Sequence, residues 1–508
     1  MEKKNINNIV YSILVYIFYL ALIYYLSSQF DLQRDWLAHP DQDLHIIYNA
    51  LLFNSGLEQE TRSAGYFTYL FFSIIVNVLY FFKLIPVYDI NSSLNNESIN
   101  SSFQDIIFFG RLFSISCISF LFLAFYWLFS YLSKDKFVGA LVPLLLIFSN
   151  GTIDHLYHIR TEVISAIFFV MAFLFLIIML KKNLSNPLYY LILFLIFFYS
   201  AQVQKALVIF YLPIVLFLVF FFKEQPIKFR VNGFDFINNK KFKLLIIFIT
   251  FLYFLTKLLT NTGDILSIIF LIVNIVIFNS FIYFVSEKNH EKSNLIILNV
   301  TIFFSIVFYK SLLSIHPSSS RFLFIDNFTT VLSYIAYTKQ YLLNDSHLIN
   351  LTNAAVLLMK NFFLVLTNIM GNISIYSILI FIYIVLTLLL IKKITKNDLI
   401  IISLSILSFF LISSFNYLRY TELGLYNIFS DFFLIIPLCC FLSNFKKEKY
   451  LFLIVIILVV NTIGYPFYKN KVLVISKMEP KNLCEVNSDY MKDLIYLNQY
   501  FLEKKICN

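Results

Sequence analysis

Charged residues and turn-forming residues are scarce in this chain. Asp, Glu, Lys and Arg make up 13% of its 508 residues, about half the share in an average soluble domain, and there are ten Gly and ten Pro. A soluble domain needs more charge than this to cover its surface. The composition therefore excludes an ordinary soluble protein.

Cysteine is also rare, with five residues in all. Cys117, Cys439 and Cys440 fall in apolar stretches, where a thiol behaves as a small core residue. Cys484 and Cys507 lie in the polar C-terminal tail. Whether these two cysteines form a disulfide depends on which side of a membrane the tail occupies, and the sequence leaves both cases possible.

Apolar residues make up 60% of the chain, and they occur in long continuous runs. A transmembrane barrel would instead show short segments of alternating polarity. We therefore expect an all-α polytopic membrane protein with about 13 transmembrane helices. The expected spans are 9–28, 105–132, 137–150, 162–180, 187–201, 206–222, 243–260, 264–285, 294–314, 372–391, 398–415, 425–444 and 449–466.

The basic residues predict the topology. Short basic loops such as 134–136 and 446–449 should be cytoplasmic, and this works only if the further apolar runs 66–85 and 352–370 do not cross fully. We expect each of these two runs to lie on the outer surface or to dip in as a re-entrant helix. The N-terminus is then cytoplasmic, and the C-terminus lies outside a multi-pass cell-membrane protein.

This topology divides the chain into a membrane domain, 1–466, and a small extracytoplasmic tail, 467–508. The first outer loop, 29–104, is large and carries amphipathic helices. The net charge of +10 lies mostly in the short loops, where it contacts anionic headgroups of membrane lipids. It does not indicate nucleic-acid binding.

Acidic and basic residues crowd into the first outer loop between Trp36 and Gly65. Asp41 follows Pro40 at the expected start of an amphipathic helix, where an aspartate is either an N-cap or a membrane-surface base, or both. Asp43 is the alternative base. Apolar residues at near-helical spacing follow, and this stripe favours packing over a lipid-chain site.

A series of short motifs, in this order, resembles the GT-C glycosyltransferases, in particular lipid-A aminoarabinose transferase and its protein O-mannosyltransferase relatives. The resemblance covers roughly residues 1–440. Its pieces are Pro40-Asp41 with Gly56, Glu60-Thr-Arg62 before Gly65-Tyr66, Gly110-Arg111-Leu112, Arg160-Thr-Glu162, Gln204-Lys205 before Pro213, His316 to Arg321-Phe322, and Arg419-Tyr420.

The resemblance implies a GT-C-like helical bundle that transfers sugar, with inversion, from a polyprenyl-phosphate-linked donor to a lipid, glycan or protein acceptor at the outer leaflet. Asp41 or Asp43 would be the catalytic carboxylate. The residues implied for the donor phosphate are Arg62, Lys205, Arg321, Arg419 and Tyr420. Those implied to shape the site are Arg111, Arg160 and Glu162, and Arg111 is placed to orient the outer loop by an ion pair.

The resemblance also implies a divalent metal ion held by Glu60 and His316. Two ligands from distant loops are a weak signal without a third, so metal-free and metal-dependent sites both stay open. His155 and His158 are three residues apart, as ligands on one helical face would be. The chain departs from the family pattern at Gln42 and Thr61, where relatives carry an acid and a lysine.

Two other classes of function are possible for such a chain. A transporter or flippase of lipid-linked substrates should carry charged residues within its spans and paired broken helices, and the few Gly and Pro argue against it. A glycan polymerase or ligase of another polytopic class should place its catalytic loop late in the chain, whereas the acid-rich loop here is early.

Overall fold

Every regular element in the described part of the chain is a helix. The computed structural model describes residues 2–38, 41–57, 66–94, 99–182, 351–372, 374–390, 394–415, 427–443, 445 and 448–480. The helices are α1 (Glu2–Ser28), a 3-10 helix (Trp36–Ala38), α2 (Asp41–Asn54), α3 (Tyr66–Phe81), α4 (Ile90–Leu94), α5 (Ile99–Ser133), α6 (Lys136–Leu141), a 3-10 helix (Val142–Leu146), α7 (Asn150–Ile153), α8 (Thr161–Lys182), α16 (Leu351–Gly371), α17 (Ile375–Leu390), α18 (Lys396–Phe415), α19 (Asn427–Leu442) and α20 (Glu448–Ser476).

Four of these helices are long and apolar enough to cross a membrane: Asn8–Ser28, Ser101–Ser133, Thr161–Ile178 and Glu448–Ser476. A fifth crossing is possible if α16 and α17, which meet at 85°, count as one broken span rather than a re-entrant loop. The protein is therefore a helical, membrane-embedded chain. The expected spans between 187 and 314 lie outside the described residues, so the total of 13 stays a prediction.

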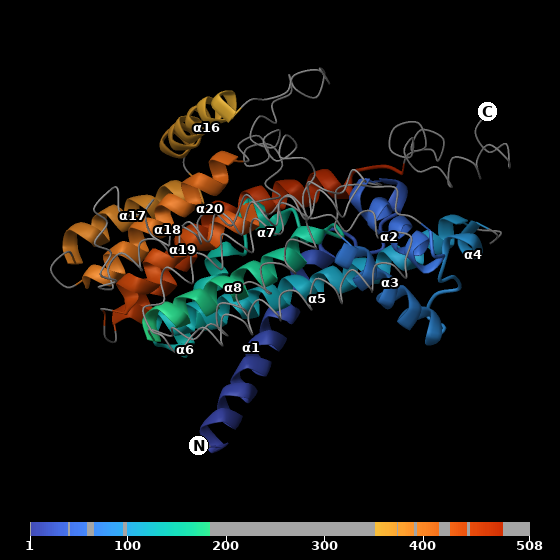
Figure 1. The fold of residues 1–508 in the computed structure, drawn as a ribbon, viewed down its shortest axis with the longest axis horizontal. Coiled ribbons are helices and arrows are strands. Elements are labelled where there is room, and N and C mark those ends of the chain that lie inside the picture. The colour runs from blue at the N-terminus through green and yellow to red at the C-terminus, as the bar shows by residue number, and fades with distance from the viewer. Residues whose placement is uncertain are drawn as a thin grey trace, which may run out of the picture.

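The long helices form a bundle around α19. Helices α5, α8, α18 and α20 run along the long axis of the molecule, while α1 leans away from them and touches α5 (Figure 1). All 16 residues of α19 are buried. Its Phe432 and Phe433 pack against Phe169 and Phe173 of α8 at ring-centroid distances of 5.0–6.1 Å. A helix that is buried on every side belongs in the centre of a bundle.

The helices of the first loop gather around the start of α5. Leu44, Ile47 and Leu51 of α2 are at most 1% exposed and belong to a core that includes Phe103 of α5 and Ile159 before α8. The apolar stripe of α2 is therefore packing, as its spacing indicated. This second core fixes α2 to the ends of two spanning helices.

One end of the bundle brings together loops that the charge pattern assigned to the cytoplasm. Asp135 caps α6 and pairs with Lys449 at the start of α20, and the hydroxyl of Tyr450 donates to it at 2.7 Å. The loop 134–136 and the start of α20 therefore lie together, as a shared side of the membrane requires. Which face is cytoplasmic stays a prediction.

Two stretches differ from the expected spans. The run 137–150 is not one helix: α6 ends at Leu141, and Pro143 opens a 3-10 helix, because proline has no N–H to donate to the preceding turn. Helix α20 contains Pro466 yet continues to Ser476. The expected boundary between membrane domain and tail, 466/467, therefore falls inside a helix.

Candidate functional site

Asp43 is the centre of a buried polar junction. Its side chain is fully buried in the first turn of α2. Nε of Arg111 lies 2.9 Å from its Oδ2, and the backbone N–H of Ile159 donates to its Oδ1 at 2.6 Å. His158 Nδ1 and Arg34 Nη2 lie 3.6 and 3.9 Å from the carboxylate. One carboxylate thus joins α2, α5 and the segment before α8.

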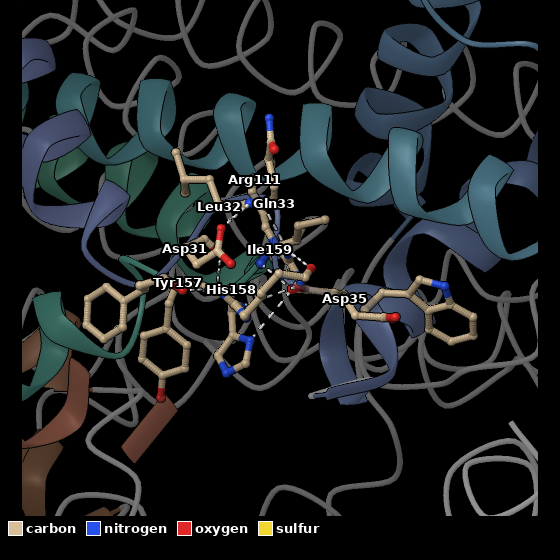
Figure 2. A network of polar contacts seen from close by, with 12 residues as sticks. Asp31, Leu32, Gln33, Asp35, Arg111, Tyr157, His158 and Ile159 are labelled. Atoms are coloured by element: carbon tan, nitrogen blue, oxygen red, sulfur yellow. Dashed lines mark hydrogen bonds and ion pairs between the residues drawn. The ribbon is translucent and has the colours of Figure 1, made fainter. Parts of the chain in front are cut away.

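Arg111 extends this junction to the chain that leaves α1. The residue is 2% exposed, and its Nη1 donates to the carbonyl oxygens of Leu32 at 3.0 Å and Arg34 at 2.9 Å (Figure 2). A guanidinium presents its donors in a rigid fork, so it can bind a carboxylate and two carbonyls at once. The first outer loop and α5 are therefore joined by an ion pair.

The charges around Asp43 keep it ionised. Burial alone would raise its pKa, but Arg111, His158 and Arg34 outweigh burial and hold the pKa well below its usual range. Burial, together with Arg111, lowers the pKa of Arg34 to about 10, so Arg34 keeps its charge at neutral pH. Asp43 is thus a permanent anion shielded from solvent, and a weak base.

A second polar group lies beside the first. Lys471 Nζ of α20 pairs with Asp154 Oδ1 at 3.1 Å, and the Tyr157 hydroxyl donates to the same oxygen at 3.2 Å. Burial raises the pKa of Asp154, against the opposing effect of Lys471. Arg34 donates to the backbone oxygen of Tyr157 and lies 5.8 Å from its ring. Tyr157 therefore links the Asp43 junction to α20.

The two neighbouring histidines do not share a helical face. Helix α7 ends at Ile153, and residues 154–160 form turns, so the expected helical spacing is wrong here. Nδ1 of His155 lies 2.6 Å from the carbonyl oxygen of Gly151 and must donate to it, whereas His158 is directed at Asp43. Burial lowers the pKa of His155 to about 4.

Arg160 and Glu162 lie where the chain enters α8. Glu162 is in the first turn of that helix and is 4% exposed, a position where the helix dipole favours an acid. Arg160 is 7% exposed, and in the described part of the chain its Nε has no hydrogen-bond partner. Both therefore lie close to the junction and are buried.

The structure describes only part of the predicted site. Asp41 is the first residue of α2, so it precedes Asp43 by two positions, but its side chain is outside the described part. The predicted residues outside the described ranges altogether are Glu60, Arg62, Lys205, His316, Arg321, Arg419 and Tyr420. No group of three or more His, Cys, Asp or Glu side chains that could hold a metal occurs in the described ranges. Whether Glu60 and His316 bind a divalent metal ion therefore stays a prediction.

Sequence reasoning missed Arg34, Asp154, Lys471 and Asp431. Arg34 and Asp154 are buried charges beside helix ends, and Asp431 is an acid inside an apolar run. An acid inside an apolar run is costly in a membrane and marks a functional position, so the signal for Asp431 was present in the sequence. Lys471 gives no such signal, because it follows the expected last span.

No family model, no curated protein and no solved structure matches this chain.

Proposed function

We propose that this chain is an integral-membrane glycosyltransferase. It takes a sugar from a polyprenyl-phosphate-linked donor and passes it, with inversion, to a lipid, glycan or protein acceptor at the outer leaflet of a cell membrane. Asp41 is the general base. The observation that carries the proposal is the fixed start of α2, where Asp43 is held by Arg111 and by the N–H of Ile159.

This anchoring supports a division of labour between the two aspartates. Asp43 has no exposed surface, and an ionised group that is surrounded by cations is a poor proton acceptor. Asp41 begins the same helix, and Asp43 fixes the position of that helix relative to α5 and α8. Asp43 is therefore a positioning residue, and Asp41 takes the proton from the acceptor hydroxyl while the bond from sugar to phosphate breaks.

The leaving polyprenyl phosphate needs positive charge that is in place beforehand. Arg62, Lys205, Arg321 and Arg419, with Tyr420, are proposed to supply it on the strength of the motif order alone. Glu60 and His316 are proposed as the ligands if a divalent metal assists. Arg160 and Glu162 are proposed to shape the site from the start of α8.

The test compares Asp41→Asn with Asp89→Asn in the full chain, reconstituted in vesicles and given radiolabelled polyprenyl-phosphate sugars. We expect Asp41→Asn to lower kcat by about 100-fold or more, because a general base contributes at least that factor, and to leave donor binding unchanged. Asp89 caps α4 and accepts from the N–H of Ser92 at 2.7 Å, a role that asparagine also fills. Asp89→Asn should keep full activity. Full activity in Asp41→Asn would refute the site.

A lipid-linked-substrate transporter is the second candidate, and the 85° break between α16 and α17 is the observation that favours it. The same vesicles separate the two functions. Movement of a fluorescent polyprenyl-phosphate sugar between leaflets, without any sugar transfer, would favour the transporter and overturn the proposal.

A further inference from the structure

Asp431 is a second buried aspartate, and no counter-charge faces it from the described residues. It lies one turn into α19 and is 2% exposed. Both of its carboxyl oxygens are buried, and among the described residues neither has a hydrogen-bond partner of normal geometry or a salt-bridge partner. A buried polar group of this kind requires an explanation, such as a bound ion, water or proton.

The groups that face Asp431 come from three elements and none is a cation. They are the hydroxyls of Ser149, before α7, Tyr376 of α17 and Ser430 of α19, together with the backbone N–H of Gly151. Tyr376 is the only titratable side chain among them. In the described residues of the helices packed on α19, which are α5, the 3-10 helix Val142–Leu146, α7, α8, α17 and α18, no Lys, Arg or His is paired with Asp431.

This set of neighbours favours a proton over a metal ion. Burying a carboxylate with no positive partner is so costly that such a group normally becomes neutral. A hard metal ion would need several oxygen lone pairs turned toward it. Gly151 presents an N–H instead, and Ser149 Oγ already accepts from the N–H of Thr152 at 3.3 Å. A proton binds to only one carboxyl oxygen of Asp431 and leaves the other oxygen to accept a hydrogen bond.

The position of Asp431 connects it to the Asp43 junction. Gly151 lies directly against α19, since a Cβ on it would be 2.4 Å from the backbone nitrogen of Ile428. The segment that starts at Ser149 then runs to His158 and Ile159, the two residues directed at Asp43. A charge on Asp431 would draw water into this contact and separate α7 from α19.

We propose that Asp431 is a proton-binding site whose bound proton holds α7 against α19, and thereby keeps the 149–160 segment in place around Asp43. The inference does not depend on glycosyl transfer. Ionisation of Asp431 would loosen the candidate site, so the site is intact only while the acid is protonated.

Infrared spectroscopy of the purified full chain tests the proton directly. We expect the carbonyl stretching band of a protonated carboxyl group at neutral pH, its downshift in D₂O, and its loss in Asp431→Asn. Asp398→Asn, at the start of α18, is the matched control and should keep the band. If Asp431→Asn does not fold, Tyr376→Phe serves instead, because removing a facing hydroxyl should shift the same band. A wild-type spectrum without the band would overturn the proposal.

Thermal unfolding distinguishes a proton from a metal ion. In the unfolded chain an aspartate ionises near pH 4, so above that pH the folded chain holds one proton more and its Tm should fall as pH rises. Asp431→Asn should remove this part of the slope above about pH 6.5, where His155 is neutral in both the folded and the unfolded chain. A Tm that instead drops when choline replaces sodium, in the wild type but not in Asp431→Asn, would show a sodium site and overturn the proposal.

Trp36 reports on the coupling, since it lies in the 3-10 helix two residues after Arg34 and is 2% exposed. The chain has two tryptophans, so Trp127→Phe leaves Trp36 as the only one. In that background we expect Trp36 emission to shift to longer wavelength as pH rises, and this shift to vanish on adding Asp431→Asn. A shift that persists in Asp431→Asn would refute the coupling. None of these readouts uses sugar transfer, so they can fail independently of the proposed enzyme.

Discussion

Two aspartates of this protein are almost equally buried, yet their surroundings are opposite. Asp43 is fully buried and lies against Arg111, with the N–H of Ile159, His158 and Arg34 around it. Asp431 is 2% exposed, and the described residues place hydroxyls and an N–H near it but no cation. The difference teaches that burial alone does not decide the role of an acid. Counter-charge makes Asp43 a fixed ionic joint, whereas Asp431, which has no counter-charge among the described residues, is the group that we propose to be protonated.

Removing the counter-charge of Asp43 should have the largest effect on stability. We expect Arg111→Met to lower the free energy of unfolding by about 3–5 kcal/mol, because it leaves a buried carboxylate unpaired. Unfolding of the purified chain by denaturing detergent measures this. Adding Asp43→Leu should recover most of the loss, since an apolar pair carries no buried charge. Equal stability of Arg111→Met and wild type would contradict the ionic joint.

Gly151 is the residue at which the 149–160 segment, which connects the surroundings of Asp431 to those of Asp43, touches α19. Gly151→Ala would bring a Cβ to 2.4 Å from Ile428 N and 2.8 Å from the carbonyl carbon of Asn427, both of them backbone atoms. Overpacking of this kind should cost up to about 3 kcal/mol of unfolding free energy. Gly110→Ala is the matched control, because its Cβ would meet the movable end of the Ile159 side chain. The hypothesis of close packing fails if the two variants are equally stable.

His155, on the same segment, should make the protein less stable in acid. Burial lowers its pKa to about 4 from 6.5, so between these values the unfolded chain binds more protons than the folded one. Stability is therefore lost as pH falls from about 6.5 toward 4, by on the order of 2 kcal/mol. Tm measured at several pH values gives this slope. His155→Asn, which can still donate toward Gly151, should flatten it, and an unchanged slope would rule out His155 as its source.

Lys471 extends the polar region to α20 but is 36% exposed, so its pair with Asp154 should contribute little. We expect Lys471→Ala to lower the free energy of unfolding by less than about 1 kcal/mol. A double-mutant cycle with Asp154→Asn isolates the pair from other effects. A coupling as large as that between Asp43 and Arg111 would remove the distinction between a buried joint and a partly solvated one.

Hydropathy was sufficient to locate most of the described helices. The runs 9–28, 105–132, 162–180, 398–415 and 425–444 correspond to α1, α5, α8, α18 and α19. It failed at Pro143, which breaks a run that is apolar throughout, and at Pro466, through which α20 continues. An apolar pattern indicates where a segment can be buried. The tertiary contacts around a proline decide whether the helix continues through it or ends there.

The site was predicted less completely, because its contacts join distant positions. Position and charge indicated that Arg111 would pair with the outer loop, and Asp41 and Asp43 were both candidates in that loop. Which aspartate faces Arg111 depends on how α2 rotates against α5, across 68 residues of chain. Local spacing does not encode that rotation. Arg34 was missed for the same reason, since its partners Asp43 and Tyr157 are close only in the folded chain.

The length of α5 sets the depth of the charged junction. Arg111 is 22 residues from the end of that helix at Ser133, and a helix rises 1.5 Å per residue, so the two lie about 33 Å apart. The hydrocarbon layer of a bilayer is about 30 Å thick. With Ser133 at one boundary of that layer, Arg111 and its carboxylate reach the opposite boundary, among the phosphates of the lipids. With that placement, the length of α5 would keep these buried charges level with the headgroups and outside the hydrocarbon layer.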